Sequence, residues 1–254
     1  MHRFYLPPAD CRDTTLLLPE RESHHAVDVL RVRRGERVNV LNGAGEEFLA
    51  EVLEPAGKQV RLRVLQRNSS PPLPCQLTLA QAITKGKSMD TIVQKAAELG
   101  AARLVPIQSE RTVAQTEAER ASAKVEKWQA IAIDAIKQCG SAWLPRLDQP
   151  IKPQGFLAGG EKFDLSLIAT LQSDARHPRE YIESFLDEKR RLPNSICVWV
   201  GPEGDFTPAE INAVRSSGAL PISLGQLVLR SETAAIYCLA VLNYELQYPR
   251  AKAA

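Results

Sequence analysis

From residue 76 onward, the chain alternates short apolar runs with longer segments whose apolar residues recur at helical spacing. This alternation is typical of strands that lie parallel in one sheet and are joined by helices covering both faces. We therefore predict an α/β fold with a mostly parallel sheet for this part of the chain. Strands are expected at Leu77–Ile83, 103–107, Asp164–Leu171, 196–200 and 221–224, and helices at 88–100, 117–139, 179–190, from 208 onward and at 231–248.

The first 70 residues follow a different pattern. The runs "RVNVL" and "FLAEVL" flank a turn that contains Gly43 and Gly45. The run "KQVRLRVLQ" places Val60, Leu62 and Val64 on one face at the period of a strand. These features indicate a small, mostly antiparallel β domain, which we expect to be a barrel.

The stretch "NSSPPLPC" separates the two patterns and disfavours both helix and central strand, because it contains three prolines. We predict a first domain over residues 1–70, a linker over 71–75 and a second domain over 76–254. Within the first domain, one helix is expected in "SHHAVDVLRVRRGE", with Ser23 as its N-cap and Gly35 as its stop.

Composition argues against several classes of protein. The sequence has no run of about 18 apolar residues, so no membrane span is predicted. Its N-terminus lacks the basic and then apolar pattern of a signal peptide. The five cysteines include no C-x-x-C pair, which favours reduced thiols and a cytoplasmic protein over disulfides or a zinc site. His24 and His25 are adjacent but have no evident third ligand, so no metal is predicted.

The charge of the chain is compatible with RNA binding without requiring it. A net charge of +2 does not by itself indicate a nucleic-acid partner. In residues 1–70, however, ten of the eleven basic side chains are arginine, whose planar fork suits phosphate and base edges. A solvated surface of ion pairs explains the same composition, and both interpretations stay open.

The stretch "VWVGPEGDFTPAEI" ends an apolar run at a tight turn and then begins a helix. Thr207, Pro208 and Glu210 form a capping box, in which Thr207 caps the helix and Glu210 reaches back to it. The turn therefore follows the carboxyl end of a parallel strand, which is where open α/β sheets bind ligands.

This turn does not suit a phosphate group. Phosphate loops use glycines, bare N–H groups and a lysine, whereas Glu203 and Asp205 stand here. The sequence also lacks a G-x-G-x-x-G fingerprint and a phosphate loop, which excludes a nucleotide hydrolase. We expect a ligand that is uncharged or cationic where it meets the turn.

A second segment, "LGQLVLRSETA", also leaves an expected strand, turns at Gly225 and enters a helix that Ser231 is expected to cap. Arg230 and Glu232 flank the helix start, either as site residues or as a surface ion pair. The following helix is apolar on most sides over residues 236–246, which predicts burial in the core or in a subunit interface.

Together, "GPEGDFTPAEI" and "LGQLVLRSETAA" resemble the paired cofactor loops of SPOUT methyltransferases, in particular the 16S ribosomal RNA (uracil-N3)-methyltransferase family (RsmE-like). Three other stretches are similar to that family. They are "HHAVDVLRVRRGE" in its N-terminal PUA-like domain, "KGKSMDTIVQKAAELGAARLVPIQSERTV" after its first strand, and "KWQAIAIDAIKQCG" in its long helix. The resemblance runs nearly from end to end in the same order.

The resemblance implies transfer of the methyl group of S-adenosylmethionine (SAM) to the N3 imide nitrogen of one uridine in the 16S rRNA of the small ribosomal subunit. It also implies a PUA-like, RNA-binding β-barrel domain at residues 1–70 and a homodimer formed through a trefoil-knotted methyltransferase domain at 76–254. Pattern alone predicts an unknotted, doubly wound sheet, because knots are rare. A sulfonium cation fits a turn that carries Glu203 and Asp205.

The resemblance also implies roles for individual residues. Arg230 and Glu232 are the candidate catalytic residues: Arg230 would orient the uridine or stabilise its anion, and Glu232 would position the base, assist proton removal or only hold Arg230. The candidate cofactor-binding residues are Leu171, Gly201, Glu203, Gly204, Leu224, Gly225, Leu229, Arg230, Ser231 and Thr233. The candidate RNA-binding residues, for which a solvated surface role is the alternative, are Arg3, His25, Arg31, Arg33, Lys85, Lys87 and Arg111.

Two positions depart from the family pattern. Asp205 stands where the family usually has a glycine, and aspartate is among the few residues that tolerate a positive φ. Ser141 stands where an arginine is usual, and Arg146 is a candidate replacement. Two alternatives stay open: an RNA-binding assembly factor that keeps the fold without turnover, and a SPOUT enzyme that modifies another RNA or a ribose hydroxyl.

Overall fold

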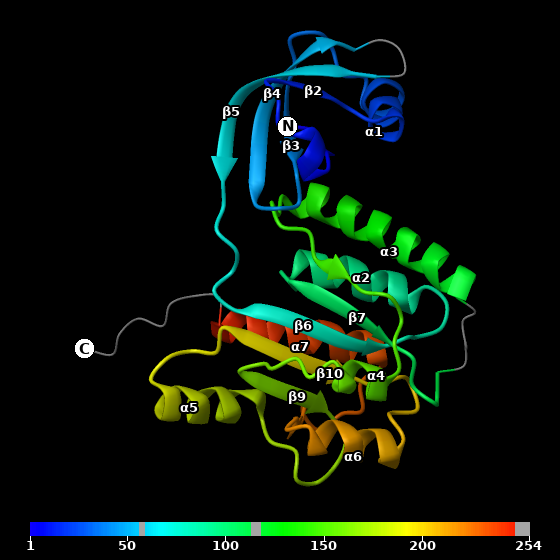
Figure 1. Ribbon diagram of the computed structural model, residues 1–254, viewed down its shortest axis with the longest axis vertical. Coiled ribbons are helices and arrows are strands. Elements are labelled where there is room, and N and C mark those ends of the chain that lie inside the picture. The colour runs from blue at the N-terminus through cyan, green and yellow to red at the C-terminus, as the bar shows by residue number, and fades with distance from the viewer. Residues whose placement is uncertain (56–58, 113–117, 247–254) are drawn as a thin grey trace. The chain divides into compact units, whose positions relative to one another are not determined.

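The computed structural model describes residues 1–55, 59–112 and 118–246, with the backbone alone for residues 118–120. The chain forms two compact units, whose elements are labelled in Figure 1. The first comprises Met1–Pro72 and Ala132–Leu144, and the second comprises Leu73–Ile131 and Pro145–Ala254. The division after Pro72 falls inside the proline-rich stretch, and the first unit also takes in a segment from much later in the sequence.

The first unit is built on a five-stranded sheet in the order β1-β3-β4-β5-β2. Strand β1 is parallel to β3, and the other neighbours are antiparallel. Val60 and Leu62 are fully buried in its core, and Val64 packs partly buried against it, which confirms the predicted apolar face. The elements are β1 (Arg3–Tyr5), η1 (Pro8–Asp10), β2 (Thr15–Leu17), α1 (Glu20–His24), η2 (His25–Val29), β3 (Arg37–Leu41), β4 (Glu46–Glu54) and β5 (Arg61–Ser69).

The helix of this unit begins earlier than predicted, and the prediction of Ser23 as its N-cap is wrong. Helix α1 starts directly after Pro19 and continues into the π-helical turn η2, which ends at Val29. The Ser23 hydroxyl donates to the Leu18 carbonyl at 2.9 Å and accepts from the Val60 amide at 2.9 Å. Ser23 therefore ties the helix to the sheet and does not cap it.

The segment 132–144 completes the first unit. The Leu144 amide donates to the Gly43 carbonyl, and the Gly45 amide donates to the Ala142 carbonyl. The Trp143 ring leaves no room at Gly45, where a Cβ atom would lie 2.5 Å from it. Gly45, in the turn between β3 and β4, must therefore be glycine, because the Trp143 side chain occupies the space that a Cβ atom would need. Trp143 lies about 100 residues later in the sequence.

The second unit contains a six-stranded sheet in the order β11-β9-β10-β6-β7-β8, with every pairing parallel. This confirms the α/β prediction. The strands are β6 (Gln76–Ala82), β7 (Arg103–Ile107), β8 (Arg146–Leu147), β9 (Leu165–Ala169), β10 (Ser195–Val200) and β11 (Leu220–Ile222). The helices are α2 (Ser88–Glu98), α3 (Ala118–Cys139), α4 (Pro153–Ala158), α5 (Pro178–Lys189), α6 (Pro208–Ser216) and α7 (Ser231–Leu246).

Helices pack on the sheet through two different sets of side chains. Cys197 and Trp199 of β10 join a buried cluster with residues of α4 and α6, including Phe156 and Val214. Helix α7 packs against α2 and against β6 and β10. Since strand side chains alternate between faces, the remaining apolar residues of β10 are directed away from the α4–α6 cluster.

In the second unit, β8 and α4 were not predicted from the sequence, because these elements are too short to show a period. The predicted start of the long helix at Glu117 and the predicted end of the last helix at residue 248 lie outside the described residues.

Helix α7 belongs to the core of the second unit on one side. Leu239 and Leu242 are 1% and 0% exposed, so the chain itself buries them. Tyr237 and Tyr244 are 40% and 75% exposed. The apolar character of this helix is thus explained by the core at Leu239 and Leu242, whereas its tyrosines are accessible.

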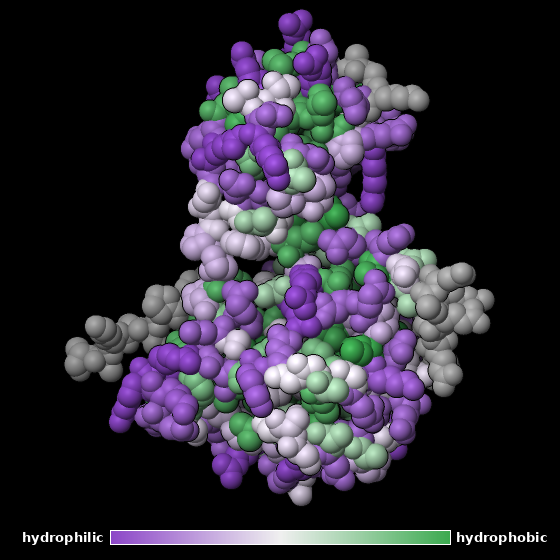
Figure 2. Space-filling model, viewed as in Figure 1, coloured by the Kyte–Doolittle hydropathy of each residue, from purple (hydrophilic) through white to green (hydrophobic). Residues whose placement is uncertain are grey.

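No helix among the described residues is both long enough and apolar enough to cross a membrane. Hydrophilic and apolar side chains are interspersed over the face that Figure 2 shows.

Candidate functional site

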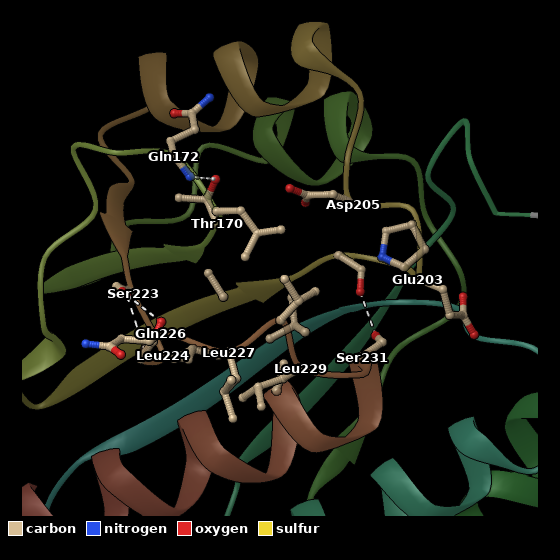
Figure 3. A pocket seen from close by; sticks show the side chains of 18 residues that line it. Thr170, Gln172, Glu203, Asp205, Ser223, Leu224, Gln226, Leu227, Leu229 and Ser231 are labelled. Atoms are coloured by element: carbon tan, nitrogen blue, oxygen red, sulfur yellow. Dashed lines mark hydrogen bonds between the residues drawn. The ribbon is translucent and has the colours of Figure 1, made fainter.

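A cavity of about 260 Å³ lies at the carboxyl ends of β9, β10 and β11, within the second unit. Its walls come from residues 169–172, from residues 200–203 with Asp205, and from residues 223–229 with Ser231 and Ala234. Figure 3 shows these side chains around the cavity. The position agrees with the rule that open α/β sheets bind ligands beyond the carboxyl ends of their strands.

The first loop of the site is the turn between β10 and α6. The Asp205 amide donates to the Pro202 carbonyl at 2.9 Å, and Asp205 has a φ of +60°. Its Oδ1 accepts from the Phe206 amide at 2.7 Å. The capping box predicted for Thr207 and Glu210 is present at the start of α6, which confirms that prediction. The turn thus uses a positive φ at the position where the resemblance implied a glycine.

Gly201 is required by the close packing of this turn. A Cβ atom on Gly201 would lie 2.8 Å from the Asp205 Oδ1 atom and 3.2 Å from the Phe206 amide nitrogen. A larger residue at 201 would push the turn away from the end of β10, and with it one wall of the cavity.

Glu210 fixes a neighbouring segment to the same loop. Its buried carboxylate accepts from the Ser109 hydroxyl at 3.0 Å and from the Glu110 amide at 2.9 Å. Arg111, which follows, donates to the Gly204 carbonyl. Arg111, predicted to contact RNA, therefore lies against the first loop.

The second loop leaves β11 and enters α7 at Ser231. The Ser231 hydroxyl donates to the Gly201 carbonyl at 2.6 Å and accepts from Nε2 of Gln81 in β6 at 3.0 Å. Ser231 is the first residue of the helix, and its hydroxyl bonds to the first loop, so the expectation that it caps α7 is wrong. The bond to Gly201 joins the two loops that the sequence singled out.

The lining of the cavity combines apolar, uncharged polar and acidic residues. Glu203 and Asp205 are its charged residues, and no Lys, Arg or His is among the described residues that line it. Burial raises the pKa of Asp205, while the hydrogen bond from the Phe206 amide and the charge of Arg111 lower it by a smaller amount. Such a lining suits a neutral or cationic ligand and opposes a phosphate.

The predicted cofactor residues fall into two groups. Gly204, Arg230 and Thr233 lie next to lining residues without lining the cavity. Those that line it are Leu171, Gly201, Glu203, Leu224, Gly225, Leu229 and Ser231.

Arg230 and Glu232, the predicted catalytic residues, flank the start of α7. Arg230 is exposed and Glu232 is half-buried. Neither side chain makes an ion pair or a hydrogen bond with another residue in the part of the chain that the structure describes. The interpretation of these two residues as a surface ion pair is therefore not supported.

The sequence also missed residues that line the cavity. Gln226, Leu227 and Val228 stand between predicted residues in the second loop, and this position alone could have identified them. Gln81 does not line the cavity but donates to Ser231; it is a polar residue within the apolar run of β6, and nothing in the sequence pairs it with Ser231. The remaining lining residues that were not predicted are Ala169, Thr170, Gln172, Val200, Pro202, Ser223 and Ala234.

The predicted RNA-binding residues are divided between the units. Arg31 and Arg33 in the first unit, and Lys85 and Lys87 in the second, are exposed. Arg3 of the first unit donates to the Lys137 and Gln138 carbonyls, so part of its donor capacity is used within the unit.

Three other positions named from the sequence have structural contacts. The ring of half-buried His25 packs edge-on against Phe4. Arg146 pairs with Asp148, and the Ser141 hydroxyl donates to the Trp143 carbonyl within its own loop. No group of three or more potential ligand side chains within the described ranges is placed to hold a metal ion.

Comparison with known protein families gives two matches. A model for an RNA methyltransferase domain matches residues 71–243, and a model for an RNA methyltransferase PUA domain matches residues 18–65.

Two relatives match most of the chain. The ribosomal RNA small subunit methyltransferase E of Synechocystis sp. is 31% identical over 250 residues, which cover 97% of this chain and 78% of the relative. The protein of the same name from Bacillus subtilis is 29% identical over 239 residues, covering 93% and 92% of the two chains.

Solved structures are similar along nearly the whole chain. A candidate methyltransferase of Legionella pneumophila in complex with SAM has a TM-score of 0.86 and 34% identity, covering 96% of this chain and 97% of that one. Ribosomal RNA small subunit methyltransferase E from Neisseria gonorrhoeae bound to SAM has a TM-score of 0.83 and 28% identity, covering 97% and 98%.

Proposed function

The chain belongs to the ribosomal RNA small subunit methyltransferase E family, and we propose that it methylates N3 of a uridine in small-subunit ribosomal RNA with SAM as the methyl donor. The observation that carries the proposal is the cavity between the two loops. A hydrogen bond from the Ser231 hydroxyl to the Gly201 carbonyl joins these loops. Relatives of the same fold were solved with SAM.

The residues of the cavity fit SAM. Leu171, Leu224 and Leu229 offer apolar surface that suits the adenine ring and the methylene groups of SAM. Glu203 and Asp205 offer carboxylates to a ligand with a sulfonium cation and an amino group. When bound, SAM supplies an electrophilic methyl group.

The rest of the chemistry falls to residues of this chain. In the reaction the S–CH3 bond breaks, an N3–CH3 bond forms, and the N3 proton of uracil is lost. Arg230, which is exposed and without a partner among the described side chains, orients the uracil and stabilises the negative charge that develops on it. Glu232, half-buried in the first turn of α7, positions the base or accepts the proton.

Labelled SAM and separated ribosomal subunits test this function. Purified protein should transfer the label to small subunits that lack the modification, and not to large subunits. Label found only in large-subunit RNA, or in no RNA, would overturn the proposal. A protein that binds SAM yet labels no RNA would match the non-catalytic assembly factor instead.

Arg230→Ala separates the role of Arg230 in catalysis from a role in holding the cofactor. Because Arg230 does not line the cavity, we expect methyl transfer to fall about 100-fold or more, the loss typical of a removed charge-stabilising group, while SAM affinity changes little. Steady-state kinetics and calorimetric titration measure the two effects. Equal losses would make Arg230 a cofactor-binding residue only.

The proposal includes a cytoplasmic homodimer formed through the methyltransferase domain. It is supported by Tyr237 and Tyr244, which give α7 an exposed aromatic side opposite its buried leucines. Leu239 and Leu242 cannot provide the interface, because the chain already buries them. Tyr244→Asp should yield a monomer by light scattering with unchanged helix content, and a dimer that persists would remove α7 from the interface.

The proposal also includes a trefoil knot in this domain. Helix α7 follows the edge strand β11, yet it packs on the central strands β6 and β10. The bond from Ser231 to Gly201 also holds the second loop against the first. Both features support a chain that returns through its own fold, as the family resemblance implies.

A further inference from the structure

Asp205 differs from the other polar groups of the cavity in conformation and surroundings. Its φ of +60° lies in the left-handed region, which few residues other than glycine adopt. Its Oδ1 is held by the Phe206 amide at 2.7 Å. In Figure 3 the side chain projects from the first loop towards Thr170 at the end of β9. The carboxylate is therefore held in a fixed orientation on the cavity wall.

The charge of this carboxylate is only partly balanced. Asp205 is half-buried and lines the cavity, and burial raises its pKa. Arg111 is the cation whose charge acts on it, but that side chain is exposed and donates to the Gly204 carbonyl. A cation inside the cavity would therefore compensate a charge that the protein leaves incompletely paired.

Substrate and product of the proposed reaction differ in this charge. SAM carries a sulfonium cation, whereas its demethylated product, S-adenosylhomocysteine, has a neutral thioether at the same position. The cavity is small, so any bound cation lies within a few ångströms of its walls, where water screens charge less than in solution.

We propose that Asp205 is a specificity-determining residue that favours the sulfonium form of the cofactor over the neutral product, and so promotes product release. The proposal rests on the proposed function, because it takes SAM as the ligand of this cavity. It assigns Asp205 a discriminating role that a glycine at this position could not have.

Three ligands and one isosteric variant test the proposal. The ligands are SAM, S-adenosylhomocysteine and sinefungin, which carries a protonated amine in place of the sulfonium methyl. Asp205→Asn removes the charge but keeps the shape, the acceptor for the Phe206 amide and tolerance of a positive φ. Calorimetric titration gives the dissociation constant of each ligand without turnover.

We expect the variant to bind SAM and sinefungin about tenfold more weakly and S-adenosylhomocysteine with unchanged affinity, a change of about 1.4 kcal/mol for the two cations. Asp205→Gly should shift the three affinities in the same way. This second variant shows whether the change comes from the lost charge or from the new asparagine amide. Asp187→Asn is the matched control, because it removes the same charge from an exposed residue of α5 that does not line the cavity. It should change the ratio of the affinities much less.

The outcomes separate the inference from the function on which it rests. An unchanged ratio in Asp205→Asn, or an equal loss for all three ligands, would overturn the inference while the function stands. A loss for SAM but not for sinefungin would show that Asp205 senses the methyl group and not the charge, which also overturns it. Wild-type protein that binds none of the three would contradict the proposed function itself.

Discussion

Ser231 joins parts of the chain that are far apart in the sequence. Its hydroxyl bonds to Gly201 in the first loop and to Gln81 in β6. All three residues are buried, so the loss of the hydroxyl would leave the Gly201 carbonyl without this donor in a place with little access to water. The site therefore depends on one small polar side chain.

Ser231→Ala should lower the free energy of unfolding by about 1–3 kcal/mol, the usual cost of an unsatisfied buried polar group. It should also weaken SAM binding, because the two loops are no longer tied together. Urea denaturation and calorimetric titration measure the two effects. Ser217→Ala, at the exposed end of α6, is the control and should cost less. Equal losses in the two variants would mean that the Ser231 bridge has no special importance.

The raised pKa of Asp205 predicts how the stability of the fold depends on pH. Burial raises the pKa of Asp205 in the folded protein, so this carboxyl group favours folding when it is protonated. That contribution is present below the ordinary carboxyl pKa and is lost as pH rises through the raised value. Asp205→Asn cannot ionise, and it should therefore melt at a higher temperature than wild type at pH 7 but not at acid pH. A difference in melting temperature that does not change with pH would contradict this account.

Asp164 provides the opposite case. Hydrogen bonds from Arg191 lower the pKa of Asp164 to about 2, so its contribution to folding is present above the ordinary carboxyl pKa and is lost as pH falls towards 2. Asp164→Asn should therefore lower the melting temperature at pH 7, with the difference shrinking in acid. Equal melting temperatures at pH 7 would mean that water screens this exposed pair completely.

At the scale of elements, helix α7 connects the cofactor site to the core. It begins at Ser231 beside the cavity, and its leucines pack towards α2 and the sheet. Leu242→Ala should lower the free energy of unfolding by about 2–5 kcal/mol, because it leaves a cavity in a closely packed region. Urea denaturation checks this. A cost below about 1 kcal/mol would show that the core collapses around the smaller side chain.

Elements with strong local signals could be predicted from the sequence. The capping box at Thr207 and Glu210 lies within four residues, and the buried strands are continuous apolar runs. Contacts between residues that are far apart in the sequence could not be predicted. Ser23 and Ser231 both resembled N-caps, but each hydroxyl bonds to a segment far away in the sequence. The position of each serine before an apolar helical segment suggested a cap, but it gave no information about these distant partners.

At the scale of the whole molecule, the two units are not two continuous stretches of chain. Residues 132–144 belong with the first unit, where Lys137 pairs with buried Glu22 and Trp143 donates to the Ser70 and Pro71 carbonyls. The proline-rich stretch marks the division after Pro72, but no local signal announces the later return of the chain. The predicted domain of residues 1–70 therefore lacks part of its compact unit.

A fragment of residues 1–72 should be less stable than the same residues in the full chain. It would lose the buried ion pair of Glu22 and the packing of Trp143 against Gly45. Hydrogen exchange of strands β3 and β4 in the fragment and in the full protein measures the difference. Equal protection would mean that residues 132–144 add nothing to the first unit.

The most direct test of the central claim is the identity of the methylated nucleoside. The protein would be incubated with labelled SAM and small ribosomal subunits that lack the modification, and the RNA would then be digested to nucleosides. The account predicts label in 3-methyluridine, lost in Arg230→Ala. Label in any other nucleoside, or no label although SAM binds, would contradict it.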